Sequence, residues 1–457
     1  MKKAQGNYTS LRPATEKRGF VSEAVEQCLR ETTPKIKDEK LRWMFENCFP
    51  NTLDTTVRHT MRGGRPDTFV ITGDIDAMWL RDSSAQVWPY LPLMKGDEPL
   101  RLVVAGLINR QTECILIDPY ANAFNREENG RHGYNDTPAP GKRVWERKYE
   151  VDSLCHMIYL AWCYYEATGS TRFMTDEFYA ALERIRHVFS VEQYHFERSH
   201  YTFERTDCPP SDTLTNGGMG DPVGYTGMTW SGFRPSDDAC RYGYLIPANL
   251  FAAAMMEKAA LMCRLDGRDT LADRMEKQGG QMRQGVMEFG TVEHPKFGRI
   301  YAYETDGLGH CNLMDDANVP SLLALPYLGL CDLHDEIYQN TRRFVLSSEN
   351  PCFYEGRLAR GVGSPHTPRG YVWPIALCIQ AMTTDDVAEQ AELLRMLLRT
   401  DARTGFMHES FHPDDATRFT REWFAWANSM FGEMLYRFYE AGTLEEIVAR
   451  VKADGAE

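Results

Sequence analysis

The sequence predicts an all-α protein folded as one compact domain. Most segments with a clear apolar period have the helical period, in which apolar residues recur three or four positions apart. Strand-like runs are few and short, and no long linker, repeat or low-complexity tract divides the 457 residues. A chain of this length with 43% hydrophobic residues can bury a large core, and single domains reach this size.

We expect about a dozen helices, joined by loops rich in Gly, Pro, Asp and aromatic residues. An early stripe consists of Val21, Val25, Cys28 and Leu29. A later stripe consists of Val387, Ala391, Leu394 and Leu398. Thr384 is placed to cap this later helix, and Asp385 and Asp386 put negative charge at the positive end of its dipole. The other candidates span residues 38–49, 97–117, 150–168, 174–190, 247–265, 269–288, 317–328, 332–346, 371–382, 418–440 and 443–453. The strand-like runs are Thr68–Thr72 and Tyr201–Glu204.

Composition narrows the class of protein. The formal charge of -14 repels the phosphate backbone, which argues against a nucleic-acid partner, whereas a neutral sugar is indifferent to it. The N-terminus lacks the apolar segment of a secretory signal, and no run of about 18 apolar residues could span a membrane. The 12 cysteines form no CxxC pair, so we expect free thiols and a cytoplasmic location. We expect residues 1–457 to form one domain, with 1–17 as a poorly ordered or peripheral extension.

The first polar cluster, Thr72–Ser83, holds three carboxylates, an arginine and a tryptophan. Arg81 is suited to hold a neighbouring carboxylate in a bidentate fork, and carboxylates fixed in this way accept hydrogen bonds from sugar hydroxyls. Trp79 can supply a flat apolar face to a sugar ring. The alternative is a capped helix start with a surface ion pair.

The second cluster, Thr229–Ala239, runs into a helical pattern. Ser236 resembles an N-cap, which would place Asp237 and Asp238 on the first turn. Dipole compensation alone could explain these aspartates. The dipole would lower the pKa of a carboxyl group there, so an acid role requires desolvation by Trp230 or Phe233.

The third cluster comprises Gly405–Phe411 and Arg418–Asn428. Glu409 lies between aromatic residues on a loop, which suits a base that holds a water over a sugar. His408 is expected to form hydrogen bonds rather than bind a metal, because no HExxH or comparable spacing accompanies it. Trp423 and Trp426 are equally compatible with core packing. Weaker clusters are Arg147–Ser153, Asp315–Asn318 and Arg369–Pro374, the last preceded by His366.

The motifs TGDIDAMWLRDSSAQVWPY, KYEVDS, SGFRPSDDA, RGYVWP, MHESF and FTREWFAWANS, in this order, resemble glycoside hydrolase family 125 over roughly residues 20–440. The resemblance implies an (α/α)6 toroid and an exo-acting, inverting α-1,6-mannosidase without metal or other cofactor. It places the general acid on Asp237 or Asp238, with Asp237 preferred, and the general base on Glu409, with Glu422 as the alternative. The expected substrate contacts are Asp74, Asp76, Trp79, Arg81, Asp82, Trp230, Arg234, His408 and Arg421.

In such an enzyme the acid protonates the leaving oxygen while the base activates a water on the opposite face of the sugar. The expected partner is a mannose-containing oligosaccharide, with no nucleic acid or membrane, and the protein is expected to be a monomer or weak oligomer. Two alternatives belong to other classes. A non-catalytic carbohydrate-binding toroid would need no opposed carboxylates, and another (α/α)6 enzyme would be a lyase or a Mg²⁺-dependent prenyl cyclase.

Overall fold

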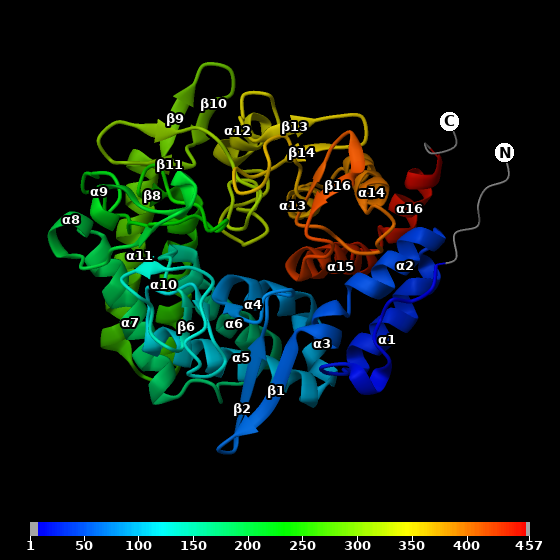
Figure 1. The fold of residues 1–457 in the computed structure, drawn as a ribbon, viewed down its shortest axis with the longest axis horizontal. Helices are drawn as coiled ribbons and strands as arrows, with labels where there is room; N and C mark the ends of the chain where they lie inside the picture. The colour runs from blue at the N-terminus through cyan, green and yellow to red at the C-terminus, as the bar shows by residue number, and fades with distance from the viewer. Residues whose placement is uncertain (1–7, 454–457) are drawn as a thin grey trace.

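Helices dominate residues 8–453, the part of the chain described by the computed structural model (Figure 1). The helices are α1 (Glu23–Thr32), α2 (Glu39–Cys48), α3 (Asn51–Thr55), α4 (Leu80–Val87), α5 (Glu98–Ile117), α6 (Val151–Thr168), α7 (Asp176–Glu192), α8 (His195–Arg198), α9 (Thr215–Gly218), α10 (Ile246–Leu265), α11 (Asp269–Phe289), α12 (Glu336–Val345), α13 (Pro374–Met382), α14 (Val387–Thr400), α15 (Ala425–Glu440) and α16 (Leu444–Ala453). Short 3₁₀ helices are η1 (Thr15–Lys17), η2 (Thr33–Lys35), η3 (Trp88–Gly96) and η4 (Pro210–Asp212).

The strands are short and pair antiparallel in small separate sheets. They are β1 (Val57–Arg62), β2 (Arg65–Val70), β3 (Met78–Trp79), β4 (Ala123–Phe124), β5 (Asp136–Thr137), β6 (Val144–Glu146), β7 (Glu204–Arg205), β8 (Tyr244–Leu245), β9 (Thr291–His294), β10 (Gly298–Tyr301), β11 (Glu304–Thr305), β12 (Cys311–Asn312), β13 (Phe353–Glu355), β14 (Arg360–Val362), β15 (Ser410–His412) and β16 (Asp415–Thr420). The longest pair is the hairpin β1–β2, in which Val57 lies opposite Val70. Among the described residues no sheet has more than three strands, so the sheets are small additions to a helical scaffold.

The helices form two concentric layers around the middle of the molecule (Figure 1). In the inner layer α10 packs on α6, α6 on α4, α4 on α15 and α15 on α13. Outer helices cover them: α5 packs on α6, α11 on α10, and α14 on α13. Helix α2, near the start of the chain, packs on α15 near its end. This is the predicted (α/α)6 toroid.

The two layers begin their helices differently. In the outer layer α5, α7, α12 and α14 each have an Asp or Thr N-cap whose side chain accepts a backbone N–H. The inner helices α4, α6, α10, α13 and α15 have no side-chain cap bond. Their first turns instead follow extended, buried residues, namely Trp79, Glu150, Leu245, Trp373 and Phe424. Because no side chain is used as a cap there, polar side chains near the starts of the inner helices can contribute to a site at that end of the ring.

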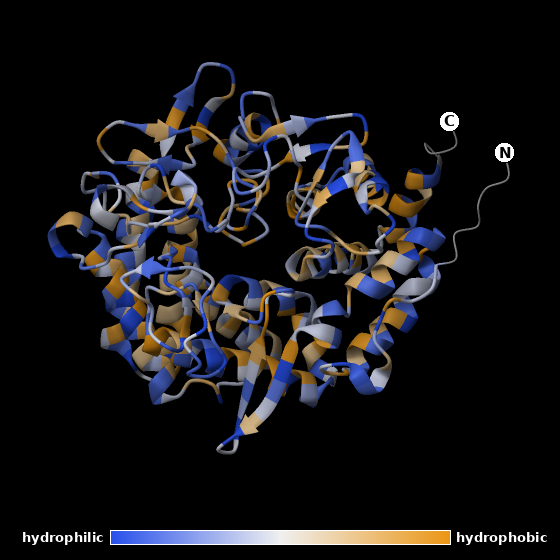
Figure 2. Ribbon diagram, viewed as in Figure 1, coloured by the Kyte–Doolittle hydropathy of each residue, from blue (hydrophilic) through white to orange (hydrophobic). Residues whose placement is uncertain are grey.

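Burial follows the layers. Every residue of α4 is buried, including its polar ones. The outer helices carry both hydrophilic and hydrophobic residues, which Figure 2 shows as mixed blue and orange on α1 and α7. The apolar stripe of each outer helix faces the inner layer and its polar residues face solvent.

Four sequence predictions of helices and helix caps are wrong, and of the strand predicted at Tyr201–Glu204 only Glu204 lies in a strand, β7. Residues 317–328 form successive turns, because Pro320 and Pro326 lack the N–H that a helix needs. Residues 415–420 form β16, so the helix predicted from 418 starts at Ala425. Asp386 rather than Thr384 caps α14.

The fourth correction concerns Ser236, which caps no helix: residues 236–243 form a turn-rich loop, and α10 starts only at Ile246. Asp237 adopts a left-handed backbone conformation (φ 67°), and its N–H donates to the carbonyl of Arg234 at 2.9 Å. Asp237 and Asp238 therefore lie in a tight loop and not on a helical turn.

The predicted extension 1–17 is described only in part, since residues 1–7 lie outside the described residues. Arg12 donates to Asp54 at 2.7 Å and to Glu26 at 2.5 Å. Across residues 8–453, no helix is both long enough and apolar enough to cross a membrane.

Candidate active site

A cavity of about 630 Å³ opens at the end of the ring where α4, α6, α13 and α15 begin. It is lined by Thr72, Ile75, Trp79, Arg81, Asp82, Gly133, Tyr134, Trp145, Glu146, Lys148, Arg205, Pro209, Ser211, Asp212, Pro235, Ser236, Asp237, Asp238, Asn318, His366, Trp373, Glu409, Arg421, Phe424 and Trp426. Its wall combines aromatic rings with charged side chains, which is typical of a site for a polar ligand with apolar faces.

Arg81, at the start of α4, holds one wall of the cavity together. Its Nη1 donates to Glu150 at 2.5 Å, and its Nη2 donates to Asp237 at 2.9 Å. Asp152 and Asp82 lie 3.5 and 3.7 Å from the same guanidinium. One buried cation therefore orients carboxylates from α4, from the start of α6 and from the loop before α10.

Asp237 receives further polar contacts from Lys148, which follows β6, and from Asn122, which precedes β4. Lys148 Nζ donates to its backbone carbonyl at 2.7 Å, and Asn122 Nδ2 lies 3.4 Å from its carboxylate. Burial opposes ionisation of Asp237, but Arg81, a hydrogen bond with Glu150, and Lys148 together lower its pKa below the ordinary value. The Asp237 side chain keeps 22% of its surface exposed at the cavity, whereas Glu150 is fully buried.

Asp238 faces a different partner. His366 Nδ1 lies 3.1 Å from its carboxylate, and only 5% of the Asp238 side chain is exposed. Withdrawal from solvent disfavours the imidazolium, but the hydrogen bond to Asp238 and the charges of Asp237 and Glu409 outweigh it and raise the pKa of His366 to about 9.

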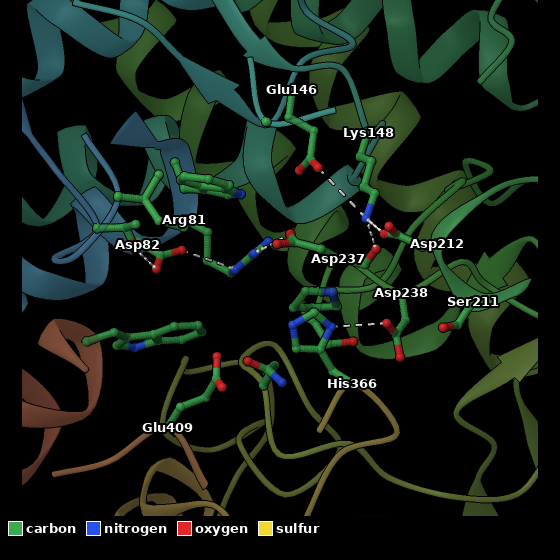
Figure 3. A pocket seen from close by; sticks show the side chains of 18 of the residues that line it. Arg81, Asp82, Glu146, Lys148, Ser211, Asp212, Asp237, Asp238, His366 and Glu409 are labelled. Carbon is green, nitrogen blue, oxygen red and sulfur yellow. Dashed lines mark hydrogen bonds and ion pairs between the residues drawn. The ribbon is translucent and has the colours of Figure 1, made fainter. Parts of the chain in front are cut away.

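Glu409 lies on another wall, directly before β15. Its N–H donates to the carbonyl of Thr420 at 3.3 Å, so the β15–β16 hairpin fixes its backbone. Arg421 Nη1 lies 3.4 Å from the Glu409 carboxylate, and Arg421 Nη2 lies 3.0 Å from Asp74. Figure 3 shows Glu409 on one side of the cavity and Arg81 with Asp237 on the other.

The mouth of the cavity is built by the loops that precede α6 and α10. Arg205 pairs with Asp136, Glu146 and Asp212 at 2.7–2.9 Å. The Tyr134 ring stacks 3.9 Å from the Arg205 guanidinium and remains 57% exposed. The ion pairs thus fix an aromatic ring at the rim.

The structure brings together only part of the predicted site. Asp237, Asp238, Glu409, Trp79, Arg81, Asp82 and Arg421 line the cavity. Asp74 and Asp76 do not; both are half exposed, and Asp76 pairs with Arg58 at 2.7 Å. Glu422, the alternative base, is exposed and also lies outside the lining.

Three further expected sugar contacts are buried supports rather than lining residues. Trp230 stacks on His195 with ring centroids 3.6 Å apart. Arg234 donates to Glu304 at 2.6 Å, and His408 stacks on Phe419 at 3.9 Å. Each therefore lies behind the wall that the ligand would contact.

Sequence reasoning gave too little weight to the residues around the start of α6. Lys148, Glu150 and Asp152 stand in a cluster that is equally typical of a capped helix start, yet all three lie in or behind the cavity wall. Glu146 and Asp212 carried no sequence signal, because ion pairing to Arg205 depends on tertiary structure. Within the described part of the chain, no group of three or more His, Cys, Asp or Glu side chains is arranged to hold a metal ion.

Comparison with known proteins places the chain among carbohydrate-active enzymes. The family described as metal-independent alpha-mannosidase (GH125) matches residues 38–436. The "Meiotically up-regulated gene 157 protein" of Schizosaccharomyces pombe is 41% identical over 448 residues, covering 94% of this chain and 88% of that protein.

Solved structures agree with this placement. A Streptococcus pneumoniae metal-independent alpha mannosidase, in a non-productive complex with alpha-1,6-mannobiose, is 46% identical with a TM-score of 0.88. The match covers 92% of this chain and 99% of that one. A bacterial glucoamylase bound to acarbose shares the fold alone, at 12% identity and a TM-score of 0.54 over 93% of this chain and 59% of its own.

Proposed function

The chain belongs to glycoside hydrolase family 125, the metal-independent α-mannosidases, and from that premise we propose that it removes terminal α-1,6-linked mannose with inversion. The resemblance read from its motifs, and the class of enzyme, are confirmed by the family match. The proposal adds the linkage, the exo action, the stereochemistry and the roles of individual residues.

One observation carries the proposed chemistry. Two carboxyl groups, each held by its own arginine, lie on different walls of one cavity: Asp237 with Arg81, and Glu409 with Arg421. A single displacement needs an acid on one face of the sugar and a base with its water on the other. We assign these two roles to Asp237 and Glu409, and the aromatic rings of Trp79, Trp373 and Trp426 line the same cavity.

In the proposed reaction Asp237 donates its proton to the glycosidic oxygen as the bond between that oxygen and the anomeric carbon breaks. Glu409 removes a proton from a water whose oxygen bonds to the anomeric carbon from the opposite face. The products are a β-mannose and the shortened acceptor. Asp237 is left ionised and Glu409 protonated, and proton exchange with solvent restores both.

Asp237 is proposed as the acid in preference to Asp238. The Asp237 side chain has the larger exposure to the cavity, 22% against 5%. Asp238 is already in contact with His366, whose Nδ1 lies 3.1 Å from its carboxylate. Asp238 is instead suited to accept a hydrogen bond from a sugar hydroxyl.

The substrate is proposed to be a mannose-containing oligosaccharide. Support comes from the α-1,6-mannobiose complex of the Streptococcus pneumoniae relative. Exo action is supported by the loops 118–150 and 205–238, which form the cavity mouth around Tyr134, Trp145 and Arg205.

The test uses α-1,6-mannobiose with EDTA present, and mannose release is measured. We expect turnover by the wild type, and Asp237→Asn and Glu409→Gln should each lower it by about 10²–10⁴-fold. Glu422→Gln is a matched control, because it removes an exposed carboxylate from the same segment outside the cavity. Near-normal turnover by Glu409→Gln, or loss with Glu422→Gln, would reject Glu409 as the base.

A further inference from the structure

The cluster around Arg81 contains more carboxyl groups than cations. Glu150, Asp237, Asp152 and Asp82 lie within 3.7 Å of this one guanidinium, and its side chain is 3% exposed. Full ionisation would bury an excess of three negative charges around one cation. Such an excess is relieved when a carboxyl group keeps its proton. The cluster therefore retains protons near neutral pH.

Glu150 and Asp237 are held together by the same two donors. Arg81 donates Nη1 to Glu150 at 2.5 Å and Nη2 to Asp237 at 2.9 Å. Asn122 Nδ2 lies 3.3 Å from Glu150 Oε1 and 3.4 Å from Asp237 Oδ1. Ser153 Oγ donates to Glu150 Oε2 at 2.8 Å, which fixes the rotamer of the fully buried glutamate. Two carboxyl groups clamped by shared donors are placed to share a proton.

We propose that Glu150 is a positioning residue that holds one proton shared with Asp237, and that this proton passes to Asp237 when Asp237 acts as the acid. This inference rests on the proposed acid role of Asp237. Arg81 and Lys148 alone would leave Asp237 ionised and unable to protonate a leaving group. With Glu150 beside it, removal of the last shared proton creates two adjacent carboxylates, which like-charge repulsion opposes.

The surrounding charges favour a proton on Glu150. Burial raises the pKa of Glu150 well above its usual range against the pull of Arg81, and the charges of Asp237 and Asp152 raise it further. Asp82 is bound by Thr72 at 2.6 Å, and Asp152 lies 3.7 Å from His156.

The remaining groups that face Asp237 are engaged elsewhere. Lys148 is ion-paired with Asp212 and with Glu146. His366 is bound to Asp238, and Glu409 to Arg421. None of these contacts involves the Glu150 side chain, so a change at Glu150 leaves them in place.

The shared proton leaves the Asp237–Glu150 pair during the reaction and is replaced at the end of each cycle. Transfer to the glycosidic oxygen leaves Asp237 and Glu150 with no proton between them while the C–O bond breaks. Glu409 gains a proton from the attacking water in the same step. After the products leave, one proton returns from Glu409 through solvent to the Asp237–Glu150 pair.

The test compares Glu150→Gln with the wild type across pH, using α-1,6-mannobiose. The amide preserves shape and hydrogen bonding but cannot carry the second negative charge. We expect the basic limb of the kcat/KM profile to move toward acid by about one pH unit or more. At any pH above that limb, turnover should fall about tenfold for each pH unit by which the limb moves. A dinitrophenyl α-mannoside, whose leaving group needs no proton, should lose much less activity.

Two variants separate this role from a structural one. Glu150→Asp keeps the charge, so its basic limb should stay closer to that of the wild type even if its rate falls. Asp67→Asn removes a buried carboxylate paired with Arg110, outside the cavity lining, and should leave the limb unmoved.

The outcomes are distinguishable. If the wild type releases no mannose, the proposed function itself fails. If the wild type is active and folded Glu150→Gln keeps the wild-type basic limb and the wild-type ratio of rates on the two substrates, the role of Glu150 is overturned. If Glu150→Gln does not fold, the Glu150→Asp variant decides. A basic limb of its kcat/KM profile that lies one pH unit or more to the acid side of the wild-type limb overturns the role of Glu150.

Discussion

At the residue scale, each proposed catalytic carboxyl group shares its arginine with a second carboxylate. Arg81 joins Asp237 to Glu150, and Arg421 joins Glu409 to Asp74. The partners differ in burial, since Glu150 is fully buried and Asp74 is 51% exposed. The partner of the proposed acid is thus withdrawn from water, whereas the partner of the proposed base is in contact with it.

This difference gives a prediction for the base. Arg421→Met should lower kcat on α-1,6-mannobiose by about 10²-fold, because Glu409 loses the contact that orients it. Asp74→Asn is the comparison, since it removes the exposed partner of the same arginine and should have a much smaller effect. Equal losses in the two variants would contradict the orienting role of Arg421.

The Asp238–His366 pair predicts a pH dependence of stability. The pKa of His366 is raised from 6.5 to about 9, so the pair stabilises the fold fully below pH 6.5 and loses this contribution as pH rises through 9. The Tm difference between the wild type and His366→Ala should therefore be larger at pH 6 than at pH 9.5. In an Asp238→Asn background the difference should vary little with pH; a persistent variation would assign the effect to another group.

Residue types and order were enough to indicate Asp237, Asp238, Glu409, Arg81 and Asp82, which stand in dense polar motifs. Sequence could not separate lining residues from supports. Trp230 and Arg234 have the residue types of sugar contacts, but they pack behind the wall on His195 and Glu304. Which side of a loop faces the cavity depends on tertiary packing that spacing does not encode.

At the scale of elements, the outer helices are set by local signals. Asp97 caps α5 through Leu100 N at 2.9 Å and also accepts from Ser22 Oγ at 2.6 Å, which ties α1 to α5. Asp386 caps only α14, through Ala388 N at 2.8 Å, and is exposed. A cap that also joins two helices should contribute more to stability than one that serves a single helix.

We therefore expect Asp97→Ala to lower the free energy of unfolding by about 2 kcal/mol or more, because it also leaves buried donors unpaired. Asp386→Ala should cost about 1 kcal/mol. Thermal unfolding of the two variants gives the comparison. A larger loss for Asp386→Ala would show that the contact with Ser22 adds nothing.

Local signals also explain which elements the sequence predicts. Residues 97–117 and 269–288 have strong caps or long apolar periods and agree with α5 and α11 within a residue at each end. The sequence does not predict helix α4, because it has only eight residues and most of them are polar, although all eight are buried. The paired strands β15 and β16 depend on each other and not on a local pattern.

At the scale of the whole molecule, the ring depends on contacts between the beginning and the end of the chain. Helix α2 packs on α15, and Lys40 Nζ donates to Asp401 at 2.5 Å and to the carbonyl of Leu398. The Asp401 side chain is 1% exposed, and Lys40 is the cation that pairs with it.

Lys40→Met should therefore destabilise the fold by about 1–3 kcal/mol, the cost of an unsatisfied buried group. The double variant Lys40→Met, Asp401→Asn should recover part of this loss, because no buried charge is left unpaired. Thermal unfolding of both variants measures the effect. Additive losses would mean that the two residues do not interact.

The toroid itself was predicted through resemblance of motifs, since helix counting alone gives only an all-α domain. The location of the protein in the cell and its oligomeric state stay predictions. The tertiary structure brings four segments together at one end of the ring, which the sequence alone does not show. They are residues 72–82, 146–152, 235–238 and 409–426.

The anomeric form of the first mannose released from α-1,6-mannobiose tests the central claim most directly. Proton NMR during the first turnovers separates the α and β anomers before they equilibrate. An acid at Asp237 and a base at Glu409 acting across one cavity predict β-mannose first. Initial release of α-mannose would contradict this account, because it requires an enzyme nucleophile and a covalent intermediate.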